Sequence, residues 1–148
     1  MHMITVFDVA NYFLTLEDES VGEGLTNMKL QKLCYYAQGL SLAQRNIRMF
    51  DNDLEAWLHG PVVRDLYVEL KQYGNNPVPY PIGEKCISLK KFSEEERQIL
   101  DNVHLDYGQY SAWMLRNMTH EETPWVKANN GKCKIISDND MKEYFSQN

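Results

Sequence analysis

Cys34, His59 and His120 are the residues whose types could support chemistry in this sequence. A cysteine nucleophile reacts as a thiolate, which needs a neighbouring base and a polarising environment. Cys34 falls instead on the apolar stripe of a predicted helix, where a cysteine packs as a small inert side chain. Structural zinc usually takes ligands from pairs such as C-x2-C, whereas the nearest cysteines, Cys86 and Cys133, are 47 positions apart. The sequence therefore predicts no enzyme, with no catalytic residue, metal ligand or cofactor, and a Cys/His hydrolase is the least favoured alternative.

The charge balance argues against nucleic acid as a ligand. The 148 residues carry 15 Lys and Arg against 21 Asp and Glu, for a formal net charge of −6. Binding to phosphate backbones depends on clustered basic residues, and this acidic chain has no basic block. With 43% hydrophobic and 24% charged residues, the composition is that of an ordinary globular protein.

The chain length predicts one domain, which we place at residues 4–148 because residues 1–3 are compatible with a cloning remnant. No apolar run approaches the roughly 18 residues of a membrane span. The three widely spaced cysteines indicate no disulfide framework. Because the N-terminus also lacks the pattern of a secretory signal, we expect the reducing cytoplasm.

Hydrophobic periodicity predicts a mostly α, compact single-domain fold with about seven helices and at most a short strand or hairpin. Gly60-Pro61 is expected to open the third helix, since proline is favoured at the first helical position. Residues 54–58 fit either a short helix or an extended piece, residues 86–89 fit a short strand, and residues 17–24 fit a loop. The expected helices cover residues 6–16, 27–44, 61–73, 94–107, 112–118, 123–128 and 138–145.

Three blocks of this sequence resemble the Panacea antitoxin domain family, which includes SocA-like and GepA-like phage-associated proteins. The blocks are Met28–Gly39 (MKLQKLCYYAQG), Glu55–Val63 (EAWLHGPVV) and the weaker set Thr119-His120-Glu121, Pro124-Trp125 and Ala128. The resemblance implies an antitoxin that neutralises a cognate protein toxin by direct binding. It leaves two alternatives: an adaptor that delivers a toxin to an ATP-dependent protease, and a phage accessory protein that binds a host factor.

The motif residues divide into an expected contact set and an expected structural set. Aromatic and basic side chains are enriched at binding hot spots, so the predicted partner-binding residues are Lys32, Tyr36, Trp57, Arg64, Tyr67 and His120. The predicted structural residues are Leu30, Leu33, Tyr35, Ala56, Gly60, Pro61, Val62 and Trp125. The competing interpretation treats Lys32 as the solvated end of a core helix and Trp57 with Gly60-Pro61 as a packed corner. Neither the toxin nor the oligomeric state follows from the sequence.

Overall fold

The computed structural model describes residues 4–17, 24–84, 86–131 and 134–147. Over these residues it contains seven α-helices and one two-stranded antiparallel hairpin, which confirms the predicted mostly α, compact fold. The elements are α1 (Val6–Leu16), α2 (Asn27–Arg45), β1 (Glu55–Trp57), β2 (Gly60–Val62), α3 (Arg64–Leu70), η1 (Lys71–Tyr73), η2 (Ile82–Glu84), η3 (Leu89–Lys91), α4 (Glu94–Tyr107), α5 (Ala112–Thr119), α6 (Thr123–Asn129) and α7 (Asp138–Phe145).

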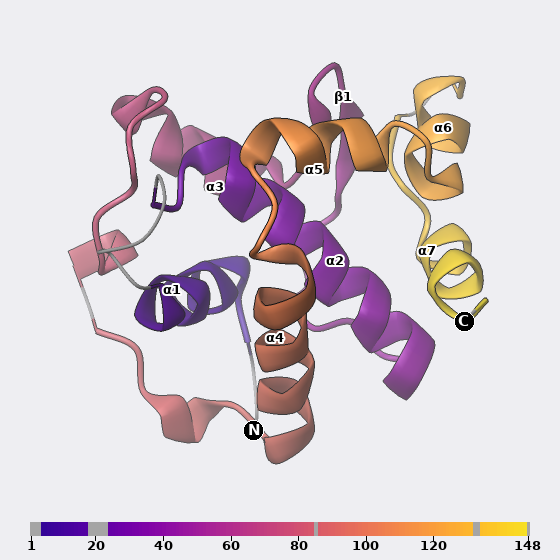
Figure 1. Ribbon diagram of the computed structural model, residues 1–148. Helices are drawn as coiled ribbons and strands as arrows, with labels where there is room; N and C mark the ends of the chain where they lie inside the picture. The colour runs from indigo at the N-terminus through magenta and orange to yellow at the C-terminus, as the bar shows by residue number, and fades with distance from the viewer. Residues whose placement is uncertain (1–3, 18–23, 85, 132–133, 148) are drawn as a thin grey trace.

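Helix α2 is the centre of the fold, as its apolar surface predicts. It runs diagonally through the molecule and packs against α1, α3, α4, α5, α7 and β2 (Figure 1). The structural residues Leu30, Leu33 and Tyr35 are all fully buried. Gly39 lets α7 approach, because a Cβ at this position would collide with the ring of Phe145. A helix that is covered on most sides holds the surrounding elements in fixed positions.

Several helices begin at the capping residues that the sequence predicts. The Thr26 hydroxyl accepts a hydrogen bond from the backbone N–H of Lys29, so Thr26 is the cap of α2. Ser93 and Glu96 form a capping box, in which each side chain accepts from the other residue's backbone N–H, at 3.1 and 2.8 Å. These contacts satisfy backbone donors that a helix start otherwise leaves unpaired.

The prediction that Gly60-Pro61 opens a helix is wrong, because both residues belong to β2. Strand β1 pairs with β2 in the register Glu55↔Val62, Ala56↔Pro61 and Trp57↔Gly60, which also resolves residues 55–57 as extended. Gly60 has φ +105°, a conformation outside the helical region and accessible mainly to glycine. Helix α3 starts only at Arg64. The preceding residue, Val63, is extended, and its N–H donates to the Gln31 side chain at 2.9 Å.

The region before α4 also differs from the prediction. Residues 86–89 form no strand, and the described chain here contains only the short 3-10 turns η2 and η3. Most of the loop expected at residues 17–24 lies outside the described residues. None of the helices in the described ranges has the length and apolarity that crossing a membrane requires.

Candidate partner-binding site

A cleft of about 310 Å³ opens between the start of α2, the hairpin and α3. The Trp57 indole forms part of its wall and meets the Tyr67 ring edge-on, with 4.9 Å between ring centroids. Arg64 lies 5.5 Å from the centre of the Trp57 ring and forms an ion pair with Glu55 at 2.9 Å. The hydrogen bond from Arg64 lowers the pKa of Glu55, so this carboxylate remains charged. Three of the predicted contact residues, Trp57, Arg64 and Tyr67, are therefore neighbours.

Helix α5 extends this surface on the other side of the hairpin, against which it packs (Figure 1). His59 in the hairpin turn lies 6.2 Å from the Trp113 ring and accepts a hydrogen bond from Arg116 at 3.3 Å. Arg116 in turn stacks on Trp113 at 4.5 Å. Leu58 is 74% exposed and Trp113 is 55% exposed. We call this continuous surface the hairpin face; it comprises Trp57, Leu58, His59, Arg64, Tyr67, Trp113 and Arg116.

Lys32, a predicted contact residue, is almost completely buried, with 1% of its surface exposed. Its ammonium group donates to the Pro61 carbonyl at 3.4 Å. Burial, followed by the nearby charge of Arg116, lowers the pKa of Lys32 to about 7. In this structure Lys32 is therefore neither an exposed surface residue nor the solvated lysine of the competing interpretation. The hairpin and α5 cover this lysine, whereas most lysines remain in water.

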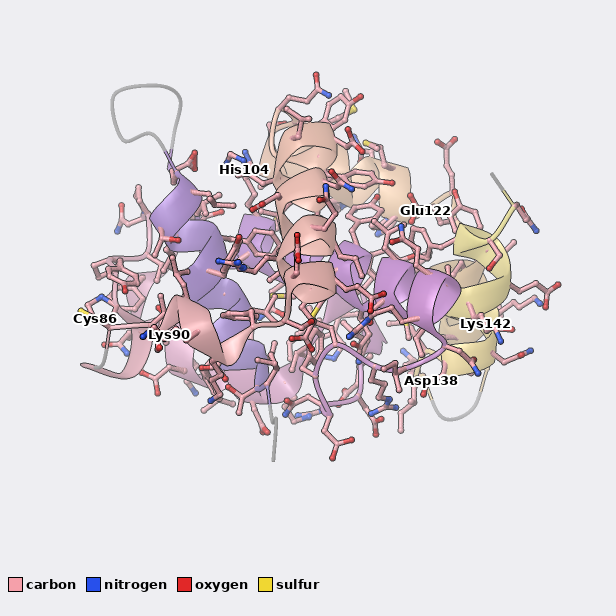
Figure 2. The ribbon with its side chains drawn as sticks, turned by 90° about the horizontal axis from the view of Figure 1, so that it is seen from below. Cys86, Lys90, His104, Glu122, Asp138 and Lys142 are labelled. Carbon is pink, nitrogen blue, oxygen red and sulfur yellow. The ribbon has the colours of Figure 1, made fainter. Side chains whose placement is uncertain are left out.

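Tyr36, another predicted contact residue, is also buried and lies away from the surface in this structure. Its hydroxyl donates to the Glu122 carboxylate at 2.8 Å, and the Tyr35 hydroxyl donates to the other oxygen at 2.9 Å. Figure 2 shows Glu122 on the side of the molecule where α2 and α7 lie. Burial raises the pKa of Glu122 to about 7, and the two tyrosine hydrogen bonds oppose this rise. The three side chains form an internal polar cluster that joins α2 to the start of α6.

His120 lies between the hairpin and α6 and contacts a residue of α6 that is bonded to the hairpin. Its ring stacks on Trp125 with 4.0 Å between centroids, and the Trp125 indole N–H donates to the Trp57 carbonyl at 2.9 Å. The His120 Nε2 atom is buried and has no hydrogen-bond partner within the described part of the chain. Burial and the charge of Arg116 lower the pKa of His120, although a hydrogen bond to the Leu58 backbone opposes them. His120 therefore supports the hairpin face from the interior side.

The described cysteines differ in their surroundings. Cys34 is fully buried, and this burial raises the pKa of its thiol well above its ordinary value. Exposed Cys86 lies at the edge of the molecule, apart from His104 (Figure 2). Residues 4–17, 24–84, 86–131 and 134–147 contain no group of three His, Cys, Asp or Glu that could hold a metal ion. Cys133 lies outside these ranges.

The structure adds residues to the site that the sequence did not single out. Leu58, Trp113 and Arg116 belong to the hairpin face, and Trp113 precedes the buried Leu115 on a short helix. The sequence signal that could have identified Trp113 is that this tryptophan lies outside the apolar stripe of its helix, which indicates an exposed side chain. The predicted structural residues are all buried: Leu30, Leu33, Tyr35, Ala56, Gly60, Pro61, Val62 and Trp125.

These features define a small helical protein with an aromatic and cationic surface beside a cleft. The chain belongs to the family described as Antitoxin SocA-like, Panacea domain, whose model matches residues 30–126. The match confirms the resemblance stated from the sequence motifs, and it contains the whole hairpin face. Neither the curated proteins nor the solved structures include a match to this chain.

Proposed function

We propose that this protein is an antitoxin that neutralises a cognate protein toxin by direct contact through the hairpin face. The observation that carries the proposal is the membership of an antitoxin-like family together with exposed Trp113 and Leu58 inside the matched region. Antitoxin activity of this kind requires binding alone, because covering the toxin's active site or substrate path stops its action.

The chemistry of the hairpin face suits a binding hot spot. Trp, Tyr and Arg dominate such spots because they combine large apolar area with polar groups that fix orientation. Trp57 and Tyr67 lie on one side of the hairpin turn, and Trp113 lies on the other. A stable complex usually buries about 1,600 Å² in total. The hairpin face would provide the apolar centre of such an interface, with Arg64 and Arg116 as its polar border.

The proposal is tested by coexpression with the gene adjacent to this one. The adjacent gene should stop growth when expressed alone, growth should return on coexpression, and the two proteins should copurify. An adjacent gene that is harmless alone and yields no complex would refute the antitoxin proposal. The amount of toxin also distinguishes the mechanism: an occluding antitoxin leaves the toxin level unchanged, whereas a proteolysis adaptor shortens the lifetime of the toxin when ATP is present.

Two matched substitutions test the location of the interface. Leu58→Ala removes a side chain that is 74% exposed on the hairpin face, and Leu105→Ala removes one that is 73% exposed on α4. We expect Leu58→Ala to weaken toxin binding at least tenfold and Leu105→Ala to change it less than twofold, as measured by calorimetry. Trp113→Ala should weaken binding by at least as much as Leu58→Ala. Equal effects of the two leucine variants would place the contact elsewhere.

A further inference from the structure

Two cationic side chains, Lys32 and Arg116, lie beside the hairpin without an acidic partner among the described residues. The Lys32 ammonium donates to Pro61 of the hairpin, and Arg116 donates to His59 in the hairpin turn. Neither takes part in any ion pair found among the described residues. The described acceptor for the Lys32 ammonium is the Pro61 carbonyl, at the long distance of 3.4 Å.

The surrounding backbone is built to admit the Lys32 side chain. A Cβ on Gly60 would lie 2.5 Å from Lys32 Cε and 2.9 Å from Thr119 Oγ1. The missing side chain of Gly60 therefore makes the space through which Lys32 reaches the underside of the turn. His120, whose Nε2 is buried and unpartnered among the described residues, directly follows Thr119 and stacks on Trp125. We call Lys32, Gly60, Arg116, Thr119 and His120 the Lys32 socket.

Burying an ammonium group is costly unless a counter-charge or several hydrogen bonds compensate for it. A methionine of similar length would avoid this cost, so the fold itself gains nothing evident from the charge. Lys32 also lines the cleft that opens beside the hairpin face. Half-buried Arg116 lies nearer the surface, where its guanidinium contacts Trp113 and His59. A negatively charged group that enters this cleft would meet Lys32 in its wall, and it would pass His59, to which Arg116 donates.

We propose that the Lys32 socket binds the carboxylate of an aspartate or glutamate side chain on the protein partner. The identity of that partner as a toxin rests on the proposed function, but the anion-binding chemistry of the socket does not. Charge complementarity favours a carboxylate, because Arg116 and Lys32 together offer several N–H donors and positive charge. The apolar residues Trp57, Leu58 and Tyr67 beside the cleft fit the partner residues that flank this acid. The acid would enter as the charged centre of a mainly apolar contact.

The socket can be tested without any toxin by NMR of lysine side chains in the purified full chain. Sodium acetate is the probe, sodium chloride at equal ionic strength is the control, and inorganic phosphate tests for a phosphate site. We expect acetate to shift the Lys32 signals saturably and to raise the pKa of Lys32 by at least one unit. Lys29 serves as the internal control, because its ammonium donates at 2.7 Å to the carbonyl of Gly108 at the end of α4, and not to the hairpin. Its signals should not change with acetate.

Two results would overturn the proposal. Lys32 signals that respond to acetate no more than to chloride would show that the socket does not bind carboxylates. A response to phosphate as large as or larger than the response to acetate would assign the socket to a phosphate ligand. Because this experiment contains no toxin, its outcome is independent of the growth experiment that tests the antitoxin proposal.

Once the toxin is identified, matched variants test the same contact in the complex. Lys32→Met keeps the length of the side chain and removes its charge, and Lys29→Met does the same one turn earlier on α2. We expect the Lys32 variant to bind the toxin at least tenfold more weakly, with the Lys29 variant within twofold of the original protein. Unchanged binding by Lys32→Met, with its fold confirmed by circular dichroism, would refute the proposed contact.

Discussion

Replacing Glu122 by glutamine should remove most of one pH-dependent contribution to the stability of this protein. Glu122 is buried, and both of its oxygens accept hydrogen bonds, from Tyr35 and Tyr36. Burial raises its pKa from 4.5 to about 7. Between these values the folded protein holds a proton that the unfolded chain releases. The free energy of unfolding therefore falls as the pH rises from 4.5 to 7 and then levels off.

The magnitude follows from the size of the pKa difference. One pKa unit corresponds to about 1.4 kcal/mol, so a rise from 4.5 to 7 corresponds to about 3 kcal/mol. The groups that face Glu122 are the hydroxyls of Tyr35, Tyr36, Tyr107 and Tyr144, and the pKa of each is raised. They remain neutral across this window and add no slope. As the pH rises from 4.5 to 8, we expect the free energy of unfolding of Glu122→Gln to increase by about 3 kcal/mol relative to that of the original protein.

The assay is urea denaturation of both proteins at half-unit pH intervals from 4.5 to 8. The difference between the two curves isolates Glu122, because every other titrating group is present in both proteins. Glu121→Gln is the matched control, since Glu121 is exposed next to the buried position. Its curve should run parallel to that of the original protein. Parallel curves for Glu122→Gln as well would refute the conclusion that this carboxyl group titrates differently in the folded and unfolded states.

Two further predictions concern the Lys32 socket. Lys32→Met should be more stable than the original protein at pH 7, because the pKa of Lys32 is lowered from 10.5 to about 7. This advantage in the free energy of unfolding should shrink by about 1.4 kcal/mol per pH unit as the pH rises above 7. Urea denaturation from pH 7 to 9 measures the advantage, and an advantage that grows with pH would contradict the prediction. Gly60→Ala should destabilise the fold by roughly 2–4 kcal/mol, because φ is +105° and the new methyl group would meet Lys32 and Thr119. Thermal unfolding measures that loss of stability. The control is Gly83→Ala, because Gly83 also has a positive φ but has open space around it. Equal effects of the two alanine substitutions would argue that backbone strain alone matters at Gly60.

Local sequence patterns were sufficient for most of the helices. Ser93 followed by Glu96 marks the start of α4, because a serine cap and an acid three residues later satisfy backbone donors within one turn. Gly60-Pro61 misled the prediction of α3, because the restricted φ of proline suits a helix start and an edge strand equally well. The pairing of Gly60 with Trp57 sets this segment as a strand, and the partner strand β1 is held from far along the chain, where the Ala56 N–H donates to the Lys134 carbonyl.

The surroundings of the proposed contact residues follow less directly from the sequence than the helices do. The sequence identified Trp57, Arg64 and Tyr67, which the fold brings together beside the cleft. It also selected Tyr36, whose hydroxyl is used internally by Glu122, a residue 86 positions away. Trp113 and Arg116 were missed because their connection to His59 joins parts of the chain that are distant in sequence. Aromatic and basic types identify good contact residues, but they do not say which of them remain at the surface.

The sequence by itself determined the family and the mostly helical fold of this protein, because motifs, caps and hydrophobic periodicity are properties of neighbouring residues. Only the tertiary structure decided that Lys32 is buried and that Trp113 is exposed. The physical reason is that burial depends on what covers a side chain. Lys32 is covered by a hairpin and a helix that follow it in the chain. The hydrophobic periodicity within α2 does not indicate which later elements pack against it.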